Sequence, residues 1–124
     1  MLLLIEDDDI IRETLAEYLS ENYEVVVAKN GKEGCLQFEQ LQDKIKVIIT
    51  DYDMPEMNGM EFLHWLHEKN IRVPKIMMTG KLISEDEYKK IRLYNAYLLS
   101  KPVDIEVIDN HVRRFFLGSN QVEL

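Results

Sequence analysis

Cysteine and positive charge are both scarce in this chain. Cys35 is the only cysteine among 124 residues, so no intramolecular disulfide can form, and no Cys/His cluster has the spacing of a zinc site. Fifteen Lys and Arg residues stand against 23 Asp and Glu residues, which gives a formal net charge of −8. Binding to nucleic-acid phosphates needs the opposite balance. The composition therefore disfavours direct nucleic-acid binding, and the cysteine content favours a cytoplasmic location.

Long apolar runs and linker-like stretches are also missing. The apolar opening Met1–Ile5 is too short for a membrane span or a signal-peptide core. Neither repeats nor Pro-, Gly- or Ser-rich stretches divide the chain, and 46% hydrophobic with 31% charged residues is ordinary globular composition. We therefore expect no membrane association and a single domain over residues 1–118. A short tail over residues 119–124 would follow, with no output domain visible.

Short apolar runs alternate along the chain with segments of helical spacing. The runs predict five strands, over Leu2–Ile5, Tyr23–Ala28, Val47–Thr50, Lys75–Thr79 and Ala96–Ser100. Apolar residues at helical spacing predict five helices around residues 11–19, 35–41, 62–66, 84–91 and 105–115. Strands that alternate with helices pair in parallel through right-handed crossovers. The fold class is therefore α/β, a doubly wound five-stranded parallel sheet covered by helices on both faces.

The predicted helix ends carry capping signals. Ser84 followed by Glu87 is typical of a capping box. Either Asp8 or Asp9 is expected to cap the first helix, because a carboxylate there accepts from free backbone N–H groups. Gly118 is expected to end the last helix.

Charged or hydroxyl side chains follow four of the five predicted strands. Because parallel strands end at one edge of a sheet, we expect Glu6, Asp7 and Asp51 to meet there. Carboxylates a few ångströms apart repel one another unless a proton or a cation relieves the repulsion. Oxygen ligands without His or Cys favour Mg²⁺, for which Mn²⁺ can substitute. A carboxylate beside such an ion can attack a phosphoryl group, while the Thr79 hydroxyl and the Lys101 ammonium hold the developing charge.

Four motifs at these strand ends resemble the receiver domains of two-component response regulators. Residues 3–8, Leu-Leu-Ile-Glu-Asp-Asp, resemble the first strand and acidic pair of that family, and residues 51–59, Asp-Tyr-Asp-Met-Pro-Glu-Met-Asn-Gly, resemble its phosphoacceptor loop. Residues 76–80 are similar to its fourth strand and switch hydroxyl, and Lys101-Pro102 is similar to its Lys-Pro pair. The resemblance covers nearly the whole chain and implies the flavodoxin-like strand order 2-1-3-4-5.

Position by position, the resemblance implies a set of site residues. Asp51 would be the phosphorylated aspartate, Asp7 a direct Mg²⁺ ligand, and Glu6 a ligand acting largely through water. The backbone carbonyl of Asp53 would complete the protein ligands of the metal. Thr79 and Lys101 would contact the phosphoryl group, and a cis peptide would join Lys101 to Pro102.

The resemblance also implies the partners. A sensor histidine kinase or a histidine phosphotransfer protein would donate the phosphoryl group. The chain would be a signalling phosphoacceptor, which catalyses only its own Mg²⁺-dependent phosphorylation and dephosphorylation. Its output would pass to a separate protein, or to self-association, through the face formed by the fourth helix, the fifth strand and the fifth helix.

Some alternatives stay open on the sequence. A receiver-like binding module that is never phosphorylated would share this fold. Asp51-x-Asp53 also resembles the nucleophile motif of aspartyl phosphatases of the haloacid dehalogenase type, but there the motif ends the first strand. Family members usually carry an aromatic residue three positions before the lysine. Here Leu98 holds that position and Tyr97 precedes it, so either the register of the fifth strand is shifted or the aromatic residue is absent.

Overall fold

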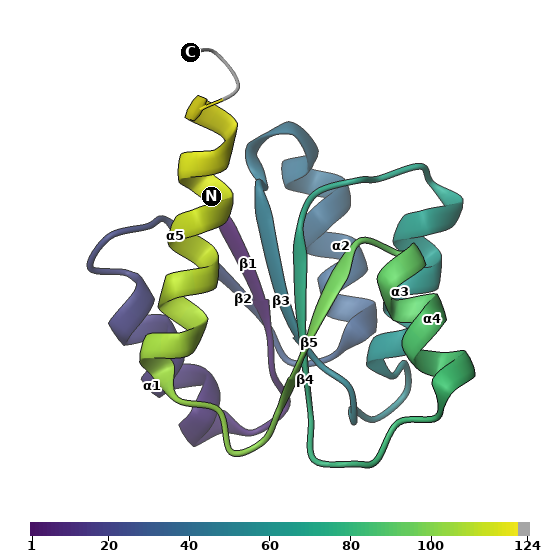
Figure 1. The fold of residues 1–124 in the computed structure, drawn as a ribbon. Helices are drawn as coiled ribbons and strands as arrows, with labels where there is room; N and C mark the ends of the chain where they lie inside the picture. The colour runs from purple at the N-terminus through teal and green to yellow at the C-terminus, as the bar shows by residue number, and fades with distance from the viewer. Residues whose placement is uncertain (122–124) are drawn as a thin grey trace.

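A computed structural model describes residues 1–121 and shows a central parallel sheet between two layers of helices (Figure 1). The five strands pair in the order β2-β1-β3-β4-β5, as predicted. The elements are β1 (Leu2–Ile5), α1 (Asp9–Leu19), β2 (Val25–Ala28), α2 (Gly31–Leu41), the 3₁₀ turn η1 (Gln42–Lys44), β3 (Val47–Asp51), α3 (Gly59–Glu68), β4 (Lys75–Thr79), α4 (Glu85–Leu93), β5 (Ala96–Ser100) and α5 (Ile105–Gln121).

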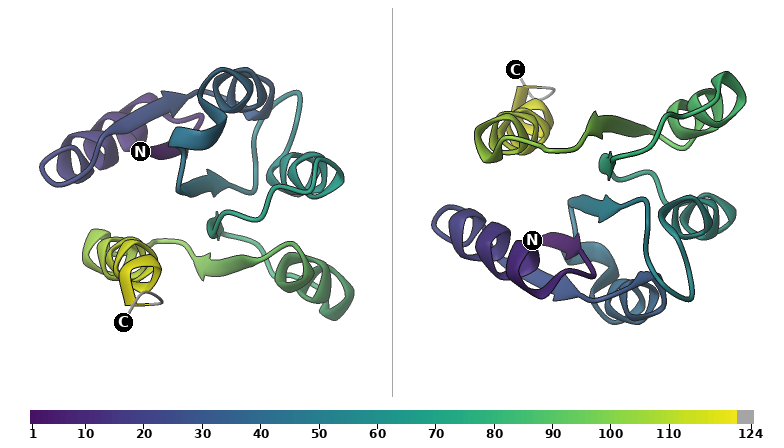
Figure 2. Two further views of the ribbon diagram at one scale, coloured as in Figure 1. Left: turned by 90° about the horizontal axis from the view of Figure 1, so that it is seen from above. Right: turned by 90° about the horizontal axis from the view of Figure 1, so that it is seen from below.

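Helices cover both faces of the sheet, α1 and α5 on one side and α2, α3 and α4 on the other (Figure 2). Successive strand side chains point to opposite faces, so each strand contributes to two cores. In β1, Leu2 and Leu4 pack toward α1 and α5, while Leu3 and Ile5 pack toward α2 and α3. All four are fully buried, and each aliphatic side chain so buried contributes about 1.5–3 kcal/mol.

Side chains cap the helices that begin near the carboxyl ends of the strands. Asp8, not Asp9, caps α1, because its carboxylate accepts from Ile11 N–H at 2.9 Å. Ser84 caps α4 by accepting from Glu87 N–H at 3.2 Å, as predicted. The reciprocal contact differs from a capping box, since the Glu87 carboxylate accepts from the Ser84 hydroxyl at 3.2 Å. One carboxylate oxygen of Glu87 therefore remains for another partner.

Two predicted boundaries are wrong by more than one residue, and the third strand extends one residue past its predicted end, to Asp51. The last helix does not end near Gly118, because α5 continues through that residue to Gln121. Residues 119–121 of the predicted tail are thus helical, and residues 122–124 lie outside the described part of the chain. The second strand begins at Val25 instead of Tyr23, because Tyr23 N–H bonds to Leu19 O in the turn that closes α1. Within residues 1–121, no helix has the length and hydropathy needed to cross a bilayer.

Candidate functional site

Three acidic side chains meet at the carboxyl ends of β1 and β3, at the lower edge of the sheet in Figure 1. Glu6 and Asp7 follow β1, and Asp51 is the last residue of β3. One carboxylate oxygen from each lies within 4.8 Å of the others. Glu6 is 0% exposed and Asp51 is 2% exposed, whereas Asp7 is open to solvent. The structure therefore brings together the three carboxylates that the sequence analysis expected to meet.

Two oxygens of this cluster are buried without a hydrogen-bond partner among residues 1–121, Glu6 Oε1 and Asp51 Oδ1. Burial, together with the neighbouring charge of Asp51, raises the pKa of Glu6 to about 7. A buried carboxylate oxygen without a partner is costly unless a proton or a cation satisfies it. The donor set is all oxygen, which suits a hard divalent ion such as Mg²⁺ or Mn²⁺.

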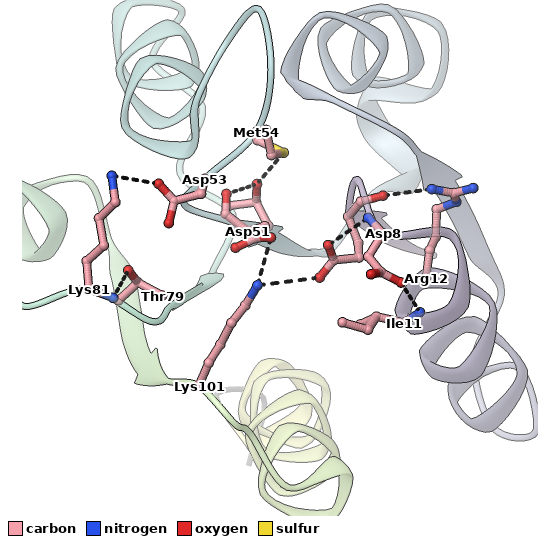
Figure 3. Close-up of polar contacts among 11 residues, drawn as sticks. Asp8, Ile11, Arg12, Asp51, Asp53, Met54, Thr79, Lys81 and Lys101 are labelled. Atoms are coloured by element: carbon pink, nitrogen blue, oxygen red, sulfur yellow. Dashed lines mark hydrogen bonds and ion pairs between the residues drawn. The ribbon is translucent and has the colours of Figure 1, made fainter.

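Lys101 is the cation that the structure places beside these carboxylates. Its Nζ donates to Asp51 Oδ2 at 2.8 Å (Figure 3). The same Nζ lies 4.0 Å from Glu6 Oε1. Partial burial alone would lower the pKa of Lys101, but the hydrogen bond and the charge of Asp51 outweigh it and hold this pKa above its usual value. The peptide bond between Lys101 and Pro102 is cis, as predicted.

The backbone around Glu6 is held by α1. Asp8 N–H donates to Glu6 Oε2 at 3.1 Å, and Arg12 reaches back to donate to Glu6 O at 2.9 Å. Arg12 also pairs with Asp9 on the outer side of the helix. The first turn of α1 therefore fixes where Glu6 leaves the sheet.

Thr79, at the end of β4, does not bond to Asp51 within the described residues. Its Oγ1 instead accepts from Lys81 N–H at 3.1 Å, while Lys81 Nζ pairs with Asp53 Oδ1 at 2.8 Å (Figure 3). Asp53 also borders a shallow, open depression of about 410 Å³ that Asp7 and Asn58 help to line. The Thr79 hydroxyl thus lies at the carboxyl end of β4, as expected, and the Asp53 side chain forms an ion pair with Lys81.

Gly59 ends the motif over residues 51–59, but the sequence analysis gave it no role of its own. A Cβ at this position would lie 2.5 Å from Asp51 O and 2.9 Å from Met77 Sδ, and Gly59 N–H donates to Tyr52 O at 2.8 Å. Only glycine lets the start of α3 pack this closely under the Asp51 backbone. The Asn58-Gly59 sequence before an amphipathic run is the signal that marks this helix start.

The strand β5 pairs with β4 so that Met77 lies opposite Leu98. Leu98 packs into the core on the α3 and α4 side of the sheet. Tyr97 points to the other side, where its ring lies 5.5 Å from those of His111 and Phe115 on α5. Leu98, three positions before Lys101, is therefore the residue of this pair that faces the α3 and α4 side of the sheet, and Tyr97 faces α5.

The fold and this site agree with a comparison of the sequence with known families. The family model for the response regulator receiver domain matches residues 2–113. The chain belongs to the response regulator receiver domain family.

Individual relatives point the same way. The chain is 32% identical over 131 residues to the probable transcriptional regulator ycf29 of Porphyra purpurea, in a match that covers 98% of this chain and 61% of ycf29. It is 30% identical over 118 residues to the transcriptional regulatory protein CrdR of Helicobacter pylori, which covers 93% of this chain and 54% of CrdR. Thus the chain spans little more than half the length of these curated relatives.

A solved structure with the same fold is the chemotaxis protein CheY4 of Vibrio cholerae. Its TM-score to this chain is 0.78 at 26% identity, and the match covers 92% of this chain and 96% of CheY4.

Proposed function

We propose that this domain is a phosphoacceptor that receives a phosphoryl group on Asp51 from a phosphohistidine donor in the presence of Mg²⁺. The donor is a sensor histidine kinase or a histidine phosphotransfer protein. The observation that carries the proposal is the carboxylate cluster of Glu6, Asp7 and Asp51, in which two buried oxygens have no hydrogen-bond partner in the part of the chain that the structure describes. The proposal places the domain in the cytoplasm, where ATP supplies such donors.

The residues present fit a divalent cation. Asp7 and Asp51 would hold Mg²⁺ directly, Glu6 would act largely through water, and the backbone carbonyl of Asp53 would complete the protein ligands. Bound there, Mg²⁺ neutralises charge that develops on phosphoryl oxygens. Mn²⁺ has the same ligand preference and would substitute.

The group transfer itself is a displacement at phosphorus. An Asp51 carboxylate oxygen forms the new P–O bond, the P–N bond of the phosphohistidine breaks, and the departing imidazole nitrogen takes up a proton. Lys101 already donates to Asp51 and carries a full positive charge beside it. Its ammonium therefore stabilises the negative charge that builds up on the phosphoryl oxygens, and the Thr79 hydroxyl joins it once the segment after β4 moves inward.

The phosphorylated form would act through the face formed by α4, β5 and α5. Large apolar side chains are exposed there, with Tyr88 at 47%, Leu93 at 68% and Tyr97 at 53% exposure. An apolar surface of this kind suits a protein partner or a second copy of the chain. A phosphate-dependent shift of α4 would change the affinity of this face, because the modification favours one of two arrangements.

Intact-mass spectrometry after incubation with acetyl phosphate and Mg²⁺ tests the proposal directly. The expected result is a single phosphate adduct on the wild-type chain that is lost with excess chelator and in Asp51→Asn. Asp43→Asn, an exposed aspartate in η1, is the matched control and should label normally.

A wild-type sample without an adduct would call for a second probe, beryllofluoride, which mimics the phosphoryl group without hydrolysing. Binding of beryllofluoride with Mg²⁺ would assign the missing adduct to a short-lived acyl phosphate. No binding would refute the phosphoacceptor function and leave a receiver-like binding module.

A further inference from the structure

Two segments that flank the site are tied together by polar side chains. The Tyr52 hydroxyl, one residue after Asp51, donates to Glu87 Oε2 on α4 at 2.5 Å. Lys81 Nζ pairs with Asp53 Oδ1 at 2.8 Å and lies 5.5 Å from the centre of the Tyr52 ring. The loop after β3 therefore holds both the loop after β4 and the first turn of α4.

Glu87 is prepared for this contact by its place in the helix. Its Oε1 accepts from the Ser84 hydroxyl, which leaves Oε2 for Tyr52. The hydrogen bond from Tyr52 holds the pKa of Glu87 below its usual value, and the same bond raises the pKa of Tyr52 to about 12. At neutral pH the contact therefore joins a neutral phenol to a carboxylate, which makes a charge-assisted hydrogen bond.

The Tyr52–Glu87 hydrogen bond restrains the segment after β4, which carries the Thr79 hydroxyl toward a phosphoryl group on Asp51. Thr79 Oγ1 accepts from Lys81 N–H, so the hydroxyl must give up this bond to contact a phosphoryl group on Asp51, and we expect residues 79–81 to move as it does. That segment is anchored at Lys81 to Asp53 and, through the start of α4, at Glu87 to Tyr52. Each anchor must break or rearrange as the segment moves, and each therefore stabilises the arrangement seen without a phosphoryl group.

We propose that the Tyr52–Glu87 hydrogen bond holds α4 in its unphosphorylated position and so lowers the fraction of molecules ready to bind a phosphoryl group. Tyr52 and Glu87 are positioning residues, which act on Asp51 and Thr79 through the segment between them. The apparent affinity of a ligand falls in proportion to the fraction of molecules in its binding-competent state. Removing the contact should therefore tighten the binding of a phosphoryl mimic. This inference rests on the proposed phosphoacceptor function.

Beryllofluoride titration in the presence of Mg²⁺ tests the proposal on Tyr52→Phe, Glu87→Ala and the double variant. Tyr52→Phe should bind about three- to tenfold more tightly than wild type, the range expected for the loss of one hydrogen bond. The double variant should gain no more than the tighter single variant, because both changes remove the same contact. Glu85→Ala is the matched control, since it removes the same charge from the first turn of α4.

Backbone amide shifts supply a readout that a purely structural role would not move. Without beryllofluoride, α4 amides of Tyr52→Phe should lie partway along the line from the free to the saturated wild-type positions. A lower melting temperature with unchanged affinity and unchanged α4 shifts would overturn the proposal, as would weaker binding by Tyr52→Phe. Failure of the wild type to bind beryllofluoride would instead refute the proposed function itself.

Discussion

Lys101 Nζ lies 2.8 Å from Asp51 Oδ2 and 4.0 Å from Glu6 Oε1, so a single ammonium faces two buried carboxylates at the ends of β1 and β3. The contact joins residues 50 positions apart in the chain and closes the site on the β5 side. It also leaves Asp51 Oδ1 without a hydrogen-bond partner in the described part of the chain.

Lys101→Met should lower the rate of phosphorylation by acetyl phosphate by about a hundredfold, the scale seen when one positioned donor to a developing oxyanion is removed. The loss follows because the only ammonium bonded to Asp51 among residues 1–121 is gone. Time-resolved intact-mass measurement gives the rate, with the exposed Lys89→Met as control. Labelling of Lys101→Met at the wild-type rate would exclude this role.

Divalent metal should stabilise the folded chain through Asp7. At a Mg²⁺ concentration ten times its dissociation constant, the melting temperature should rise by about 4–6 °C, because the ion binds the folded state alone. Asp7→Asn should lose most of this rise, since it removes the solvent-open carboxylate of the cluster. Thermal unfolding with and without Mg²⁺, repeated with Mn²⁺, measures the effect. An equal rise in Asp7→Asn and in the control Asp43→Asn would place the ion elsewhere.

The sequence was sufficient to predict the sheet and the residues at its edge, for an identifiable reason. Strands such as Leu2–Ile5 and Lys75–Thr79 are buried on both faces of the sheet. Short, nearly continuous apolar runs of this kind are typical of strands in a parallel sheet that helices cover on both faces. Parallel pairing then fixes where Glu6, Asp51 and Lys101 must lie, because every strand ends at the same edge.

Contacts between loops and the exact helix ends could not be predicted in this way. Tyr52 and Glu87 are 35 residues apart and carry no pattern that links them, so only the folded structure shows their bond. Glycine is common at helix ends, which is why Gly118 was expected to end α5. A glycine inside a helix costs only about 1 kcal/mol, however, and α5 continues past Gly118. The register of β5, which decides between Leu98 and Tyr97, likewise depends on pairing with β4.

Gly59→Ala should destabilise the fold by about 1–3 kcal/mol, the usual cost of overpacking. The added methyl group would meet Asp51 O at 2.5 Å, and a backbone atom there cannot yield without moving the site. Gly80→Ala is the matched control, because its Cβ would approach no atom more closely than 4.0 Å. Urea unfolding of both variants measures the difference. Equal stability of the two would show that α3 shifts freely under Asp51.

Lys75 offers a test of stability against pH at the opposite edge of the sheet. Its side chain is buried, with the residue 1% exposed, and Nζ donates to Val73 O at 2.7 Å and to Tyr94 O at 3.0 Å. Burial lowers the pKa of Lys75 from 10.5 to about 8. Between these two values the unfolded chain binds more protons than the folded chain, so stability increases as the pH rises.

The contribution of Lys75 to the free energy of unfolding should increase by about 2 kcal/mol between about pH 7 and about pH 9.5. Lys75→Met lacks this titration. Over the same pH interval its free energy of unfolding should therefore rise by about 2 kcal/mol less than that of the wild type. Urea unfolding of both chains at several pH values measures the difference, and the exposed Lys46→Met should follow the wild type. Parallel pH dependence of wild type and Lys75→Met would mean that Lys75 titrates alike in the folded and unfolded chains, and that its two carbonyl partners offset the cost of burying the charge.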